Sequence, residues 1–330
     1  MEMMTKSKQL IESIKNDKKF ANNRKKYITK TKNFLFWLFR ITVLIGISYV
    51  ILGPLIGIVA NSFFSDSDKT NPMVYIIPQA PTLERYRLSF LRLDYVEVLS
   101  QTLFYDLSIM VIQVLVCSMV GYGFARFKFP FKNALFACVI MMIVIPTHSI
   151  MLPLYVTFQN FDFFGLARLF GSGEMNLLGS QVPMYIMSIF GCGLRAGLFI
   201  YIFNQFFRGL PKEIEEAAFV DGAGMWYTYF KIMLVNAIPS VITVAIFSMV
   251  WQYNDTFFAK LFNISDKIVI SKKITSLQAT IQNVDRVMSP TISRLYLYAG
   301  IVLVILPIVI IYVLLQRRFI EGVERSGIVG

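Results

Sequence analysis

The sequence predicts an all-α polytopic membrane protein with six transmembrane helices, and three observations support this fold class. Hydrophobic residues make up 56% of the 330-residue chain, and the mean hydropathy of +0.60 exceeds that of an ordinary soluble domain. Several apolar runs reach the length of about 20 residues that a helix needs to cross the hydrocarbon core. A lysine-rich segment precedes the first run, which is the pattern of a cytoplasmic terminus.

The first 33 residues are polar and contain ten Lys or Arg residues, which carry most of the formal net charge of +12. We therefore predict a basic cytoplasmic extension over residues 1–33 and a six-helix membrane domain over residues 34–330. Such a basic run can also bind nucleic acid. Next to a membrane span, a topology signal that touches anionic lipid is the favoured interpretation, so no nucleic-acid partner is expected.

Five apolar runs contain no Asp, Glu, Lys or Arg, and they cover residues 41–60, 107–125, 133–155, 233–253 and 296–315. A sixth predicted span runs from Pro183 to Phe207 and is interrupted by Arg195. An even number of spans with a cytoplasmic N-terminus predicts a cytoplasmic C-terminus. Residues 61–101, 156–181 and 254–294 are then external, whereas the loops after the second and fourth spans are cytoplasmic.

A charged stretch separates the fourth and fifth predicted spans, residues 211–239, with the sequence PKEIEEAAFVDGAGMWYTYFKIMLVNAIP. Glu213, Glu215 and Glu216 lie early in it, where the dipole of a helix favours acidic side chains. Asp221 and Gly222 follow, a pair that ends a helix in a turn. An amphipathic run then leads into the next span. The stretch predicts two short helices around a turn, presented as a docking surface.

This stretch resembles the EAA loop of permease subunits from binding-protein-dependent ABC importers. The matching positions, all in register, are Glu216, Ala217, Ala218, Gly222, Ile232 and Leu234. Val235 stands where the family pattern has proline. The resemblance implies a type I ABC importer permease-like bundle, in which the EAA loop (about residues 211–234, Asp221 included) is the coupling helix that inserts into a groove on the ATPase subunit.

Other segments carry the same resemblance, which covers roughly residues 34–330. They include 81–86 before the second span, 121–127 at its end, and the Trp251–Asn254 segment at the outer end of the fifth span. The chain looks most similar to carbohydrate permeases of the maltose-system G-subunit type. A permease for another solute, such as a polyol or glycerol phosphate, is the first alternative. A secondary transporter is the second, although neither inverted repeats nor coupling residues in the spans are evident.

The resemblance places the chain in the cell membrane and implies four partners: a second homologous permease subunit, a dimer of ABC ATPases, an extracytoplasmic solute-binding protein, and the lipid of the membrane. The chain itself is expected to be a transport subunit and not an enzyme. It has no Gly-Lys dipeptide, and hence no GxxxxGK(S/T) phosphate-binding loop, and its single histidine is not part of a His/Cys cluster with metal-ligand spacing. No cofactor is expected in this chain, and ATP and Mg²⁺ would bind to the partner ATPases.

Three residues are candidates for the path of the solute. Trp251 and Asn254 lie at the outer end of the fifth span, where an aromatic ring can stack on a sugar face or anchor the chain at the membrane interface. Arg195 interrupts the fourth span, and a charge there should face a partner or a wet cavity. It can contact substrate, pair with a carboxylate of a partner subunit, or extend to the membrane surface.

Overall fold

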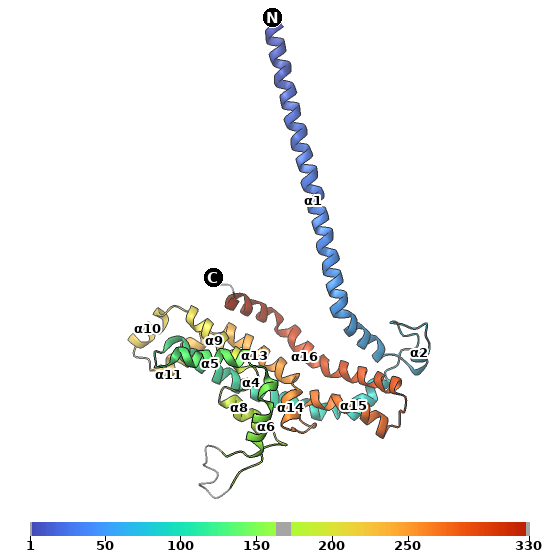
Figure 1. The fold of residues 1–330 in the computed structure, drawn as a ribbon, viewed down its shortest axis with the longest axis vertical. Coiled ribbons are helices and arrows are strands. Elements are labelled where there is room, and N and C mark those ends of the chain that lie inside the picture. The colour runs from blue at the N-terminus through green and yellow to red at the C-terminus, as the bar shows by residue number, and fades with distance from the viewer. Residues whose placement is uncertain (1, 163–172, 328–330) are drawn as a thin grey trace. The chain divides into compact units, whose positions relative to one another are not determined.

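The computed structural model is built of helices (Figure 1) and describes residues 2–162 and 173–327, with side chains described for residues 29–162, 173–314 and 316. The predicted external segment 156–181 is therefore described only in part. In chain order, the helices are α1 (Glu2–Ser62), α2 (Asp66–Thr70), α3 (Glu84–Arg92), α4 (Tyr95–Arg126), α5 (Lys132–Val144), η1 (Thr147–Ile150), α6 (Met151–Gln159), α8 (Val182–Ile189), α9 (Ala196–Gly209), α10 (Glu213–Val220), α11 (Met225–Tyr227), η3 (Thr228–Met233), α12 (Leu234–Asn236), α13 (Ile238–Tyr253), α14 (Phe257–Leu261), α15 (Ile270–Val284) and α16 (Pro290–Gly327).

The chain falls into two compact units, residues 1–60 and 61–330. The first unit consists of α1, which continues without a break through the predicted boundary between the basic extension and the first span. Its part from Thr29 to Ser62 is long and apolar enough to cross a membrane. The basic segment and the first span therefore share one helix and are not separated by a loop.

Three helical segments are long and apolar enough to be membrane spans: Thr29–Ser62, Tyr95–Arg126 and Pro290–Leu314. Two further pairs meet these criteria together but are bent, Lys132–Val144 with Thr147–Gln159 by 105° and Met225–Asn236 with Ile238–Tyr253 by 78°. Counting each bent pair as one span gives five. The described residues thus provide three to five candidate spans of the six predicted.

The segment from Pro183 to Phe207 was predicted as one span, but in the structure it is divided into two short helices, α8 and α9. Gly191 and Arg195 both have positive φ between these helices, so the backbone turns out of the helical path there. The predicted third span bends at Pro146, which cannot continue the hydrogen-bond ladder. The predicted fifth span starts later than residue 233, at Ile238, because residues 225–236 form a separate bent segment.

Helix α4 lies at the centre of the second unit and packs against α9 and α13, while α13 also packs against α16. Phe199, Phe203 and Phe207 recur every four residues on α9, so they line one helical face, and all three are fully buried. Lipid chains are as apolar as these rings. Close van der Waals packing between helices, more than exclusion from water, therefore stabilises this part of the core.

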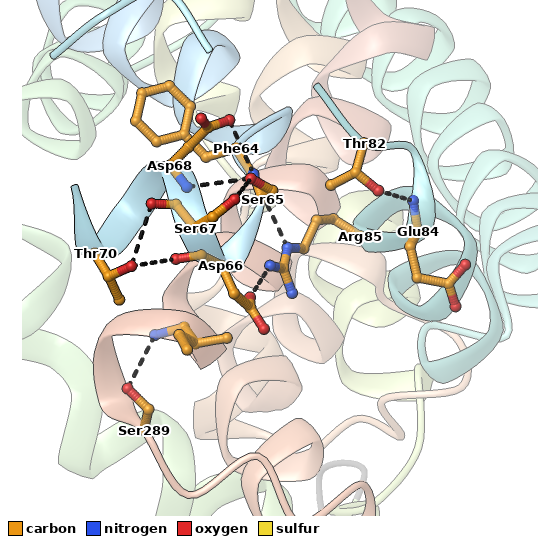
Figure 2. A network of polar contacts seen from close by, with 11 residues as sticks. Phe64, Ser65, Asp66, Ser67, Asp68, Thr70, Thr82, Glu84, Arg85 and Ser289 are labelled. Atoms are coloured by element: carbon orange, nitrogen blue, oxygen red, sulfur yellow. Dashed lines mark hydrogen bonds and ion pairs between the residues drawn. The ribbon is translucent and has the colours of Figure 1, made fainter. Parts of the chain in front are cut away.

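A polar network holds the segment between α1 and α3 (Figure 2). Ser65 caps α2 by accepting from the Asp68 N–H, while the Ser65 N–H donates to the Asp68 carboxylate. Arg85 forms an ion pair with Asp66, and its Nε donates to the Phe64 carbonyl at 3.3 Å. These contacts tie the start of α3 to the segment that follows α1, residues 64–68.

The carboxylate of Asp68 also fixes the loop that follows α2, because it accepts from the backbone N–H groups of Gln79 and Ala80 at 3.1–3.3 Å. Burial by itself would raise the pKa of this carboxyl. The N–H donors of Ala80, Ser65 and Gln79 together outweigh that effect and hold the pKa below its ordinary value. Asp68 is therefore a charged anchor at neutral pH.

Candidate functional site

The EAA loop forms the predicted pair of short helices around a turn. Helix α10 ends in a Schellman motif, in which the Gly222 N–H donates to Phe219 O at 3.0 Å and the Ala223 N–H donates to Ala218 O at 2.9 Å. This motif needs a left-handed residue after the helix, and Gly222 supplies it with φ of +82°. The second half runs through α11, a six-residue π-helix (η3) and α12.

The turn of the EAA loop encloses a hollow of about 560 Å³ that brings together four of the predicted coupling residues, Ala218, Asp221, Gly222 and Ile232. Glu216 and Ala217 lie on the exposed side of α10, and Leu234 is half-buried on α12, away from the hollow. Large apolar side chains around the turn are also exposed, among them Val220 (87%), Trp226 (60%) and Tyr227 (59%). An apolar patch of this kind on a charged loop is a feature of docking surfaces.

A buried charge cluster anchors the EAA loop to the end of α4. The carboxylate of Glu215 accepts a hydrogen bond from the Tyr122 hydroxyl and lies 3.2 Å from Arg126 Nε. Both charged side chains are nearly buried, Arg126 at 6% and Glu215 at 11% exposed. Arg126 also donates to the Leu210 carbonyl at 2.9 Å. The first helix of the loop is therefore fixed to α4 by a charge-assisted network.

The second half of the loop is anchored to the same helix. Tyr229, on the π-helix, shares a 2.6 Å hydrogen bond with the Ser118 hydroxyl, and its ring packs 5.2 Å from that of Tyr122. Because both halves bind α4 between residues 118 and 126, a displacement of the loop must carry this end of α4 with it or break these contacts.

The role of Glu215 was not predicted from the sequence, which placed it only among first-turn acids. The sequence contained one partial indication of this pairing: Arg126 stands at the end of an apolar helix, where a nearby carboxylate would stabilise its charge. Nothing in the sequence pairs it with Glu215 in preference to Glu213 or Glu216. Both of those side chains are exposed in the structure.

The break between α8 and α9 places Arg195 at the edge of a cavity of about 350 Å³. Buried Gln113 of α4 holds this break, because its Nε2 donates to the Leu194 carbonyl at 3.1 Å. Ser248 of α13 in turn donates to Gln113 Oε1 at 2.5 Å. Side chains of two other helices thus satisfy part of the polar backbone at this break.

The predicted solute-path residues Arg195 and Trp251 lie together, with the Arg195 guanidinium 5.5 Å from the centre of the Trp251 ring. The same indole stacks on Phe247 at 5.0 Å and on Phe199 at 5.8 Å. Its ring is therefore engaged within the bundle, and stacking of a sugar on it would require one of these neighbours to move. Asn254 ends α13, is exposed, and donates back to the Val250 carbonyl at 2.8 Å.

The predicted second span, which began at residue 107, left out an ionisable residue that the structure buries, Asp106. Helix α4 begins well before the apolar run predicted from residue 107, and Asp106 within it is only 1% exposed. In the part of the chain that the structure describes, neither oxygen of its carboxyl group has a hydrogen-bond partner. Of the three cysteines, Cys117 is buried, whereas Cys138 and Cys192 are exposed.

Comparison with protein families identifies residues 88–325 as a match to the binding-protein-dependent transport system inner membrane component. The match covers most of the second unit, including α4, the α8–α9 segment and the EAA loop. It therefore contains both regions described above.

Two curated relatives match over most of their lengths. The chain is 26% identical to the arabinooligosaccharides transport system permease protein AraQ of Halalkalibacterium halodurans, over 91% of this chain and 99% of the relative. It is 27% identical to the maltodextrin transport system permease protein MdxG of Bacillus subtilis, over 76% and 81% of the two chains.

Among solved structures, the chain is similar to one in a bacterial ABC transporter that imports the acidic polysaccharide alginate. The TM-score is 0.67 at 18% identity, over 86% of this chain and 96% of the other, which shows a shared fold. An all-helical membrane fold of this type, a family match over most of the chain and full-length permease relatives agree. The chain belongs to the family of inner membrane components of binding-protein-dependent transport systems, as a multi-pass permease subunit without a catalytic role of its own.

Proposed function

We propose that this permease imports sugars or oligosaccharides by alternating access driven by partner ABC ATPases. The EAA loop carries the proposal, because its exposed apolar turn offers a docking surface while the Glu215 network fixes the loop to α4. Relatives that transport arabinooligosaccharides and maltodextrin support sugars as the solute class. A polyol or glycerol phosphate is the alternative solute.

The proposed assembly contains a second homologous permease, an ATPase dimer that binds ATP and Mg²⁺, and an extracytoplasmic solute-binding protein. The ATPase would contact the exposed face of α10 and the hollow beside Gly222. Glu216, Ala217, Ala218, Asp221, Gly222, Ile232 and Leu234 form or support that surface in the proposal. Arg195, Trp251 and Asn254 remain the proposed solute-path residues.

Co-purification and reconstitution test the proposal. The chain, expressed with its genomic neighbours, should co-purify with ATPase subunits and a second permease. Proteoliposomes made from the complex, offered labelled maltodextrin, arabinooligosaccharide and D-glucuronate in turn, should accumulate at least one of these sugars, and only when ATP and the binding protein are both present. Accumulation driven by a proton or sodium gradient without ATP would instead establish a secondary transporter.

The proposed topology has six spans with both termini in the cytoplasm, so that the divided α8–α9 segment crosses as the fourth. Glu213 is exposed at the start of the EAA loop, and Glu213→Cys should react with an impermeant thiol reagent only in inside-out vesicles. Asn283 is exposed on α15, and Asn283→Cys should react only in intact cells. Asp285 nearby suits this experiment less, because it forms an ion pair with Arg92.

Both labelling experiments use a background in which exposed Cys138 and Cys192 are replaced by alanine. Labelling of both introduced cysteines from the same side of the membrane would contradict the six-span arrangement. In the six-span arrangement only the fifth span separates the two introduced cysteines, and it therefore places them on opposite sides of the membrane.

A further inference from the structure

Contacts from neighbouring helices hold the break between α8 and α9 in a specific shape. Arg195 adopts φ of +59°, a conformation that residues with a Cβ rarely take and that concentrates at functional sites. Gly193 cannot be replaced easily, because a Cβ there would lie 2.6 Å from Gln113 Nε2 and 2.8 Å from Ser188 Oγ. Packing and hydrogen bonds from α4 therefore hold the backbone in the shape that presents Arg195.

The guanidinium of Arg195 is a cation without a counter-charge. Among the described residues no carboxylate or hydrogen-bond acceptor contacts it, and its observed partner is the π-face of Trp251. A cation over an aromatic face keeps its N–H donors free at its edge. A charge within a membrane segment costs at least about 2.5 kcal/mol unless it meets a partner or water. The Arg195 side chain is exposed in the described chain, so its N–H donors are open to a ligand that enters the adjoining cavity.

The cavity beside Arg195 has the size of a small-molecule site, at about 350 Å³. Its lining is mostly apolar and comes from α5, η1, α6, α8, α9 and α14 and from the residues that join them. Apart from Arg195, the side chains of Thr147 and Cys192 are the polar ones on the described lining. A neutral sugar would offer the guanidinium only hydroxyl acceptors, whereas an anionic oxygen group would form stronger, bidentate, charge-assisted hydrogen bonds with it.

We propose that this cavity binds a solute carrying an anionic oxygen group, a carboxylate or a phosphate, with Arg195 as its counter-ion. The inference rests on the proposed import function for the statement that the ligand is transported. It narrows the solute class from sugars in general to acidic or phosphorylated sugars of small size. Gln113 acts as a positioning residue, since it holds the backbone carbonyl next to Arg195.

Cys192 lines the same cavity and provides a probe that does not depend on transport. The full-length chain with Cys138→Ala, in phospholipid nanodiscs, leaves Cys192 as its exposed thiol, because Cys117 is buried. Its reaction rates with an anionic sulfonate and a cationic trimethylammonium methanethiosulfonate are each divided by the rate with free 2-mercaptoethanol. We expect the normalised ratio to favour the sulfonate by about tenfold, in the range of electrostatic steering.

Arg195→Gln should bring the ratio to about one, and Arg195→Lys should retain a preference for the sulfonate. Arg208→Gln is the matched control, because Arg208 is exposed on the same helix outside the cavity lining, and it should leave the ratio unchanged. D-glucuronate or glucose 6-phosphate should slow the labelling of Cys192 in the Arg195 protein, and glucose should not. Which of the two protects distinguishes a carboxylate from a phosphate.

Three results would overturn the inference: a ratio insensitive to Arg195→Gln, equal protection by glucose, or loss of the sulfonate preference when the partner permease is added without solute. The last would place the counter-ion on the partner. Failure of ATP-driven uptake would contradict the proposed import function and leave these rates unaffected. Conversely, if neutral sugars are taken up with ATP and neither anion slows the labelling of Cys192, the proposed anionic ligand is ruled out and the proposed import function stands.

Discussion

Replacing Glu215 with alanine is expected to release the EAA loop from α4. The substitution leaves the nearly buried Arg126 without its carboxylate and the Tyr122 hydroxyl without its acceptor. Breaking a buried ion pair on one side costs about 3–5 kcal/mol. We therefore expect the backbone amides of residues 213–236 to lose most of their hydrogen-exchange protection, and ATP-driven uptake to fall to background.

Glu213→Ala is the matched control, because Glu213 lies on the same helix and its side chain is exposed. It should change exchange and uptake little, as surface charges usually contribute less than about 1 kcal/mol. Glu215→Gln should be intermediate, since an amide oxygen can still accept from Tyr122. Equal protection in Glu215→Ala and the unmodified protein would show that the charge cluster does not hold the loop.

Replacing Gly222 with valine is expected to uncouple ATP hydrolysis from uptake. The space around Gly222 is open, so the effect comes from the backbone and not from a clash. A left-handed conformation costs a residue with a Cβ roughly 1–2 kcal/mol, and a β-branched one is a marked outlier there. Relaxation of φ would break the Schellman hydrogen bonds and reshape the hollow that the turn encloses.

ATPase activity and uptake of the reconstituted Gly222→Val complex, both normalised to permease in the membrane, measure this effect. We expect either continued hydrolysis without uptake or dissociation of the ATPase, with the bundle still folded. Gly224→Ala is the control, because Gly224 has an ordinary φ of −72° and open space around it. Normal uptake by Gly222→Val would remove the turn from the coupling surface.

Helix α4 contacts both regions of interest. Ser118, Tyr122 and Arg126 hold the EAA loop at one end, and Gln113 holds the break beside Arg195. These contacts span about 20 Å of one continuous helix, at about 1.5 Å per residue. A rigid element bound to both sites is a physical route by which a movement of the loop can reach the cavity. Substitutions at either end test that route.

The sequence by itself predicted the features that depend on composition and on neighbours along the chain. Apolar content and run length gave the helical membrane class, because a bilayer imposes a length on each span. The EAA loop followed from local signals as well, since acids in a first turn and glycine after a helix act within a few residues. The family resemblance rested mainly on the spacing of residues within this loop, and the family match over residues 88–325 confirms the family.

Tertiary structure decided the points that depend on residues far apart. Tyr122 and Glu215 are 93 residues apart, and any of three acids could have met Arg126 from the sequence alone. The fourth span was predicted as one helix, because an apolar run looks the same whether the helix is straight or divided. Its break depends on Gln113 and Ser248 of other helices, which satisfy the freed backbone.

Asp106 shows the same limit, since counting apolar runs excluded it from the span, yet neighbouring helices bury it in α4. The placement of Arg195 against Trp251 and a cavity likewise follows from how α9 and α13 pack around α4. Hydropathy along a chain reports whether each residue favours water or an apolar environment. Burial, pairing and cavities are set by which helices meet, and that information lies in contacts between segments distant in sequence.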